Sequence, residues 1–132
     1  MPDAEGETDP EDGFDIDEGG LGKIIATFIA SSASDNDDEG FDLDEEADGK
    51  VRVSFTWCDA NGNADEGIAL AELGEGELSA RIRRSESTDN GGSGVKAEQE
   101  APGEGTVVLR EVLISGNAED LPDVAGVVVI QP

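Results

Sequence analysis

The sequence predicts an all-β fold: an antiparallel β-sandwich or barrel of about eight or nine short strands built from hairpin repeats. Three observations lead to this prediction: apolar and polar residues alternate with period two, Gly- and Asp-rich turns recur at regular spacing, and the chain contains an internal repeat. The length of 132 residues corresponds to one domain, which we place at residues 13–132. Residues 1–12 are strongly acidic, and we expect a flexible or partner-ordered arm there.

The repeat has an offset of 27 residues. Gly13–Phe28 and Gly40–Phe55 are identical at eight of 16 positions, and all four phenylalanines of the chain fall on matched positions. The same offset relates Asp38-Glu39-Gly40 to Asp65-Glu66-Gly67, and one further step leads to Gly94-Val95. We therefore predict two clear repeats followed by a third and a fourth of decreasing similarity, each a β-hairpin. The alternative is that successive hairpins merely reuse Gly and acidic residues in their turns.

The strands follow from the alternation within each repeat. In Lys50–Trp57 the apolar side chains fall on one face, with Arg52, Ser54 and Thr56 on the other. Leu78–Ile82 alternates in the same way. Residues 64–74 are assigned to a strand by the repeat, although a short helix ended by Gly74 is an alternative. The later strands are expected at Val95–Glu100, Thr106–Ser115 and Gly126–Ile130.

Two strands depart from the alternation because they are apolar on both faces. These are Ile24–Ala30 and Val127–Ile130. An antiparallel strand normally shows one polar face to water. Such a strand is therefore either buried centrally or in contact with another subunit. For the second alternative the candidate interface residues are Ile25, Ile29, Val128 and Ile130.

The charge of the chain is extreme. It contains 33 acidic residues against eight basic ones and no His, and the net charge is −25. This charge opposes compaction unless salt screens it, which indicates a protein from a halophilic system working in high monovalent salt. It also argues against nucleic acid as a partner. The one basic cluster, Arg81, Arg83 and Arg84, either neutralises neighbouring acids within the sheet or docks an acidic partner subunit.

The composition excludes several kinds of chemistry. Without His, neither a Ser-His-Asp triad nor a His-containing metal site can form. The single cysteine, Cys58, excludes an intramolecular disulfide and fits a small buried residue at the end of a strand. The acids lie in turns rather than in an apolar cleft, so we expect no enzyme.

A divalent cation, Ca²⁺ or Mg²⁺, is the better chemical hypothesis. Short oxygen donors alternate at Asp59, Asn61, Asn63 and Asp65, and Asp35 and Asp37 begin a loop that weakly matches an EF-hand. The alternative for the first group is a turn in which Asn61-Gly62 supplies the positive φ angles. Apart from such an ion, we expect no cofactor.

The N-terminal residues lack the features of a secretory signal, and no apolar run approaches the roughly 20 residues of a membrane span. We therefore expect a cytoplasmic or virion location with no membrane contact. The expected function is that of a non-enzymatic structural or assembly protein, best described as a virion component such as a capsid-decoration, cement or tail protein. The expected partner is a further copy of the chain or a larger protein lattice. The alternative is a cation-dependent binding module.

Overall fold

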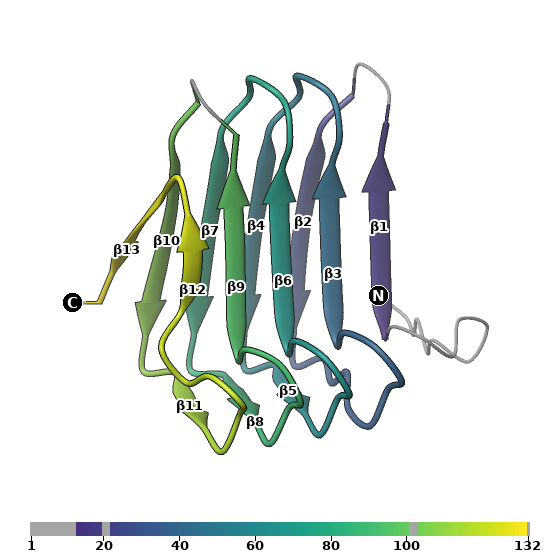
Figure 1. Cartoon of the computed structure of the whole chain (residues 1–132), viewed down its shortest axis with the longest axis vertical. Coiled ribbons are helices and arrows are strands. Elements are labelled where there is room, and N and C mark those ends of the chain that lie inside the picture. The colour runs from purple at the N-terminus through teal and green to yellow at the C-terminus, as the bar shows by residue number, and fades with distance from the viewer. Residues whose placement is uncertain (1–12, 20–21, 101–102, 132) are drawn as a thin grey trace.

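The computed structural model, which describes residues 13–19, 22–100 and 103–131, is a parallel β-solenoid of about four turns. Three parallel sheets form its walls (Figure 1). The predicted antiparallel sandwich or barrel is therefore wrong, although the all-β class is right. The predicted arm at residues 1–12 lies outside the described residues.

Each of the three middle coils contributes one strand to each sheet, whereas the first and the last contribute strands to sheets A and B only. Sheet A, nearest the viewer in Figure 1, contains β1 (Phe14–Glu18), β3 (Phe41–Glu45), β6 (Ile68–Glu72), β9 (Val95–Gln99) and β12 (Asp123–Ala125). Sheet B lies behind it and contains, in spatial order, β2 (Ile24–Ile29), β4 (Val51–Thr56), β7 (Leu78–Arg83), β10 (Gly105–Arg110) and β13 (Val127–Ile130). Sheet C closes the third side with β5 (Asp59–Asn61), β8 (Glu86–Thr88) and β11 (Leu113–Ser115).

The repeat predicted from the sequence is confirmed and sets the register of the strand pairs. Phe14 pairs with Phe41 and Phe28 with Phe55, so equivalent residues of successive coils stack. The stacked rings are 4.9 Å and 5.1 Å apart, with interplanar angles of 4° and 11°. Ile68 pairs with Val95, which confirms the fourth unit as well. The hairpin interpretation fails because consecutive strands belong to different sheets, and each strand pairs with its counterpart one coil away.

Most of the predicted strands are present at the expected positions. Residues 64–74 contain strand β6 and no helix. Residues 106–115 form two strands, β10 and β11, because the chain turns there from sheet B to sheet C. The last coil is shortened, since Gly105 pairs with Val127 rather than with a residue 27 positions later.

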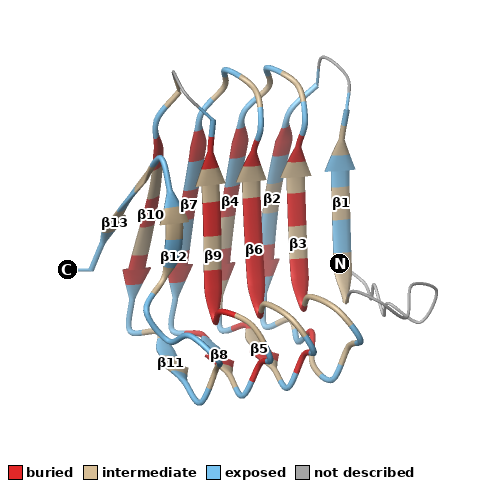
Figure 2. Cartoon of the chain, in the orientation of Figure 1, coloured by how far each residue is buried: buried red, intermediate tan, exposed pale blue. Residues whose placement is uncertain are grey.

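The core lies between the three sheets, and Figure 2 shows that buried residues are concentrated on the middle strands, such as β3, β6 and β9. Every second side chain of the central strands points inward, and Phe41, Leu43 and Phe55 are fully buried. Truncating such a core aromatic to Ala typically costs about 3 to 5 kcal/mol. At the two ends of the solenoid several inward residues are only partly buried, among them Phe14 and Val129, although Ile24 and Phe28 of β2 are buried. Cys58 is buried, as predicted, and its thiol donates to the carbonyl of Phe28 at 3.3 Å.

A column of asparagines runs through the interior where sheet C leads into sheet A. The amide nitrogen of Asn36 donates to Oδ1 of Asn63 at 2.8 Å, Asn63 donates to Asn90 at 2.9 Å, and Asn90 donates to Asn117 at 2.7 Å. The asparagines of the middle coils also bind backbone groups: Asn63 Nδ2 donates to the carbonyl of Ala33 at 3.0 Å. The column therefore satisfies buried polar groups and ties the coils together.

A second buried column consists of the last residues of β3, β6 and β9. Oε1 of Glu45 accepts from the amide of Ala47 at 2.9 Å, but Oε2 of Glu45 and Oε2 of Glu72 have no hydrogen-bond partner among the residues that the structure describes. Gln99 holds the equivalent position one coil further, where its Nε2 donates to the carbonyl of Gly76 at 3.0 Å. Burial raises the pKa of Glu72. The amide side chain of Gln99 therefore makes hydrogen bonds through both of its polar atoms, whereas the carboxyl groups of Glu45 and Glu72 each do so through only one oxygen among the described residues.

The corner between sheets B and C has the same unusual backbone in every coil. Its residues, 27 positions apart, adopt positive φ angles of 52°, 56°, 50° and 57°: Ala30, Trp57, Arg84 and Glu111. A further corner uses Asp35, Gly62, Asp89 and Gly116 in the same way. Of the positive φ angles expected at Asn61-Gly62, the one at Gly62 is present, whereas Asn61 ends strand β5 without one. The equivalent residues of each corner therefore form a row along the solenoid, one in each of four successive coils.

The two strands that are apolar on both sides are the two edges of sheet B. β2 lies at one end of the solenoid and β13 at the other. Their outward side chains are exposed: Ile25 by 59%, Ile29 by 60%, Val128 by 62% and Ile130 by 45%. Central burial of both faces is therefore wrong for these strands.

Candidate docking face

The outer surface of sheet B, which we call face B, carries no acidic residue. The five strands offer 14 outward positions, three on each of the four long strands and two on β13, and none is Asp or Glu. Four of the five arginines of the chain occupy these positions: Arg52, Arg81, Arg83 and Arg110. In a chain of net charge −25, face B is therefore locally positive.

The structure brings all seven predicted interface residues to face B and its margin. Ile25 and Ile29 lie on one edge strand, and Val128 and Ile130 lie on the other. Arg81 and Arg83 are on β7, the middle strand, and Arg84 is at the corner that follows it. The arrangement is a basic centre flanked by two apolar edges.

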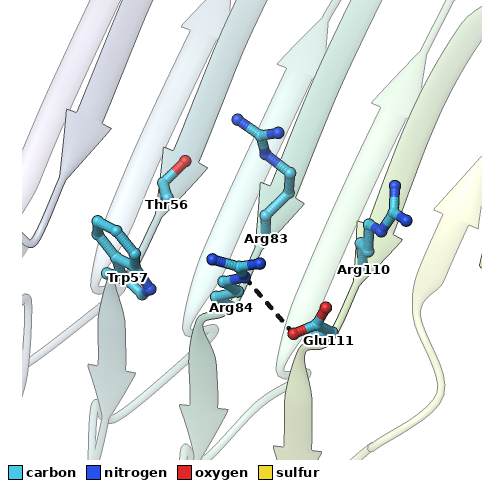
Figure 3. Close-up of a pocket in the computed structure, with 6 residues that line it drawn as sticks. All are labelled: Thr56, Trp57, Arg83, Arg84, Arg110 and Glu111. Carbon is cyan, nitrogen blue, oxygen red and sulfur yellow. Dashed lines mark ion pairs between the residues drawn. The ribbon is translucent and has the colours of Figure 1, made fainter.

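A cavity of about 380 Å³ lies at this corner, where sheet B leads into sheet C (Figure 3). Its six lining residues are Thr56, Trp57, Arg83, Arg84, Arg110 and Glu111. Arg84 Nε lies 3.5 Å from Oε1 of Glu111, and the indole of Trp57 beside it is 56% exposed. Three guanidinium groups beside an exposed aromatic ring form a suitable surface for carboxylate groups.

Sequence reasoning did not select Arg110 or Trp57 for this face. The signal was in the repeat, because Arg110 is 27 residues after Arg83, and Trp57 is 27 residues before Arg84. Parallel in-register pairing brings such residues to neighbouring positions.

The outer surface of sheet A, which we call face A, has the opposite character. Its ten outward positions include six acids and one lysine: Asp15, Asp17, Asp42, Asp44, Glu98, Asp123 and Lys96. Asp17 and Asp44 pair in register, so like charges are adjacent. Burial, and then the charges of Asp17 and other acids, raise the pKa of Asp44 to about 6.

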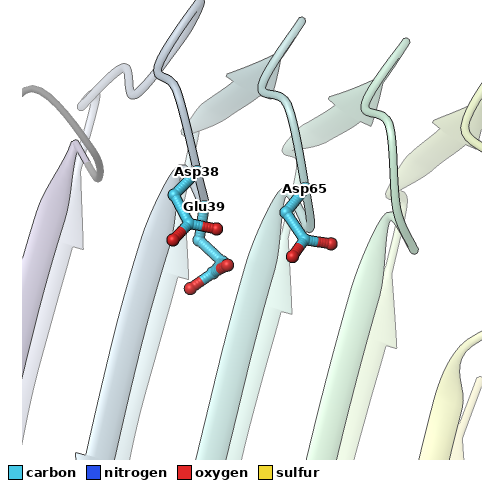
Figure 4. A group of neighbouring side chains, drawn as sticks. All are labelled: Asp38, Glu39 and Asp65. Carbon is cyan, nitrogen blue, oxygen red and sulfur yellow. The ribbon is translucent and has the colours of Figure 1, made fainter.

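One group of acids lies at the margin of face A, at the end of sheet A near sheet C (Figure 4). Among the described residues, Asp38, Glu39 and Asp65 are the one set of three or more His, Cys, Asp or Glu residues whose ligand atoms lie within 4.8 Å of one another. Glu66 follows Asp65 in the chain, and its pKa is raised to about 7 by burial and by the carboxyl group of Asp65. The group is a geometric cluster of carboxylates from two successive coils.

Of the six predicted cation ligands, only Asp65 belongs to this cluster. Asn63 is a member of the buried asparagine column. Oδ1 of Asn61 accepts from the backbone amide of Thr88 at 3.1 Å and from its hydroxyl at 2.8 Å. Asp35 is a positive-φ corner residue, Asp37 lies in the loop after it, and Asp59 begins β5. The six residues therefore do not form one site, and cation binding stays a prediction.

Comparison of the chain with known protein families, with curated proteins and with solved structures finds no match. Among the described residues, no helix is long and apolar enough to cross a bilayer.

Proposed function

We propose that this chain is a non-enzymatic assembly protein that binds an acidic protein surface through face B. The observation that carries the proposal is the distribution of charge. A quarter of all residues are acidic, so the 14 outward positions of face B would hold about three or four acids if acids were placed evenly. They hold none, and they hold four arginines instead.

The side chains of face B are those that protein interfaces favour. Arg is enriched in interfaces, and its planar guanidinium group binds carboxylates in a bidentate manner. The exposed apolar residues at both edges, such as Ile25 and Val128, add area that gains free energy when water is removed from it. An acidic surface is therefore the partner that face B fits best.

The rest of the surface supports a high-salt setting for this assembly. The chain carries a net charge of −25, and face A places aspartates next to each other in register. Screening at about 1 M salt shortens the range of this repulsion to roughly 3 Å. We include a halophilic setting in the proposal, whereas the assignment to a virion stays a prediction.

The test is binding of a fluorescein-labelled oligo-glutamate peptide, followed by fluorescence anisotropy. The KCl concentration is the lowest at which circular dichroism shows the folded chain. We expect the triple variant Arg81→Ser/Arg83→Ser/Arg110→Ser to bind at least about tenfold more weakly than the unmodified chain, a loss of about 1.4 kcal/mol.

The matched control neutralises the three lysines instead: Lys23→Ser/Lys50→Ser/Lys96→Gln. It changes the net charge by the same amount but leaves every arginine of face B in place. We expect its affinity to stay within about twofold of the unmodified chain. Equal losses in both variants, or no binding by the unmodified chain, would overturn the proposal.

A further inference from the structure

Face A contains a trough along its middle strand. The outward residues of β6 are Ala69 and Ala71, whose short side chains leave space between the neighbouring strands. In register with Ala71, Asp44 lies on one side and Glu98 on the other. A cavity of about 340 Å³ occupies this place, and Ala69, Ala71, Asp44 and Glu98 are among the residues that line it, together with Lys96 beside Ala69.

Face B carries a ridge along its own middle strand. Arg81 of β7 is flanked in register by Ser54 on one side and Val108 on the other, both shorter side chains. Arg83, two residues later, points to the same side of the sheet. Neither guanidinium group forms an ion pair within 4.0 Å with any residue that the structure describes. The ridge is therefore positively charged, stands above its neighbours at Arg81, and can form ion pairs with a partner.

We propose that the acidic surface bound by face B is face A of a second copy of this chain, with the Arg81 and Arg83 ridge seated in the alanine-floored trough. This inference rests on the proposed function and names its partner. Both the ridge and the trough follow the middle strand of a five-stranded parallel sheet. Strands in the two sheets have the same spacing of about 4.8 Å, so the rows of side chains on the two faces repeat with one period.

The electrostatics of the trough support this pairing. The carboxyl group of Asp44 is partly buried among other acids, and its pKa is raised to about 6. Burial is the main cause of this shift and the neighbouring acids add to it, and a guanidinium group between Asp44 and Glu98 would relieve the part that comes from repulsion. Such a pair is shielded from solvent once the faces meet, and shielded pairs are screened less by salt than exposed ones.

The contact joins two different faces, so each copy still has one free ridge or trough. Such heterologous contacts continue from copy to copy and produce open chains unless the rotation closes them into a ring. Five strands of five to six residues give a face of about 400 to 480 Å², or about 800 to 960 Å² buried in total, from the strand spacing and rise. This is below the size of a stable two-protein interface, so we expect weak association that grows with protein concentration.

The test is sedimentation velocity over a range of protein concentrations, with three variants at the KCl concentration defined above. The ridge variant is Arg81→Ser/Arg83→Ser, and the trough variant is Asp44→Asn/Glu98→Gln. The third variant, Ala71→Leu, fills the trough without changing the charge. We expect the mass of the unmodified chain to rise with concentration and each variant to remain a monomer.

The decisive experiment is a mixture of the ridge variant and the trough variant. The ridge variant keeps an intact trough and the trough variant keeps an intact ridge, so an equimolar mixture should form one-to-one pairs and nothing larger. This result also shows that both variants are folded. Association of the unmodified chain that the variants do not reduce would contradict the inference, as would a mixture that stays monomeric.

The outcome separates the two proposals. If the unmodified chain binds oligo-glutamate through its arginines but stays monomeric at every concentration, face B docks another acidic protein and only the second-copy inference fails. If it neither binds the peptide nor associates, the proposed function fails as well.

Discussion

Face A and face B are built from the same coils, yet they differ in almost every outward residue. Inward, both sheets contribute apolar residues to one core. Outward, six of ten positions are acidic on face A, and none of 14 is acidic on face B. Because outward positions are little constrained by core packing, the fold does not require this difference, and it supports our proposal that the two faces meet different surroundings.

The acidic character of sheet A extends into the interior. The last residues of β3 and β6, Glu45 and Glu72, are fully buried, and one oxygen of each has no partner within the described part of the chain, whereas the inward positions of sheet B are apolar. Carboxyl groups therefore lower the stability of the folded chain on both sides of sheet A, by burial on the inner side and by mutual repulsion on the outer side. The inner side of sheet B is apolar, and its outer side carries an excess of positive charge.

Removing salt should have the largest effect, because it acts on all the acids of face A at once. Two unit charges one strand apart repel by roughly 1 kcal/mol in water, and several such pairs amount to much of the 5 to 15 kcal/mol that stabilises a domain. We expect the midpoint of thermal unfolding to rise steadily with KCl and the chain to unfold in dilute buffer, measured by circular dichroism. If the unfolding midpoint does not change with KCl, repulsion among the acids of face A does not destabilise the folded chain.

The second prediction concerns the interior of sheet A. Glu72→Gln should stabilise the fold by about 1 to 3 kcal/mol, because an amide can donate where the carboxyl oxygen lacks a partner. Gln99 shows the geometry, since its Nε2 donates to the carbonyl of Gly76. Urea unfolding at fixed KCl measures the change. The reverse substitution, Gln99→Glu, is the control and should destabilise; a change of the same sign in both would contradict this explanation.

The third prediction is a smaller dependence on pH that arises from face A and its margin. The pKa values of Asp44 and Glu66 are raised in the folded chain to about 6 and about 7. A raised carboxyl pKa contributes stability below the unfolded value, and this contribution is lost as the pH rises through the folded value. We therefore expect these two groups to make the urea midpoint higher at about pH 5 than at about pH 8. Asp44→Asn/Glu66→Gln should flatten this slope, and an unchanged slope would assign it to other groups.

Much of the local structure could be predicted from the sequence, but its pairing could not. Alternation located β4 and β7, and the offset of 27 residues located the coils. A hairpin and a solenoid coil both need two strands joined by a Gly-rich turn, so the pattern fits either. The distinguishing signal was the identity of matched aromatics: Phe14 over Phe41, for example, stacks directly only when equivalent strands pair in parallel and in register.

The candidate site was predicted in part for the same reason. Face B was found through its apolar edges and through Arg81 and Arg83, which are close in sequence. Arg110 comes from another coil, and only the parallel register places it beside Arg83. The trough exists because the side chain of Ala71 is small and those of its neighbours are larger. The sequence alone does not show which residues lie beside Ala71, so it could not predict the trough.

The most direct measurement is residue-resolved chemical labelling of arginine and carboxyl side chains, read by mass spectrometry at low and high protein concentration. We predict that Arg81 and Arg83 of face B and Asp44 and Glu98 of face A lose reactivity together as the concentration rises, while Glu86 on the outer side of sheet C does not. Protection confined to the open ends, at β1 and β12, with the arginines of face B equally reactive at both concentrations, would contradict docking through face B.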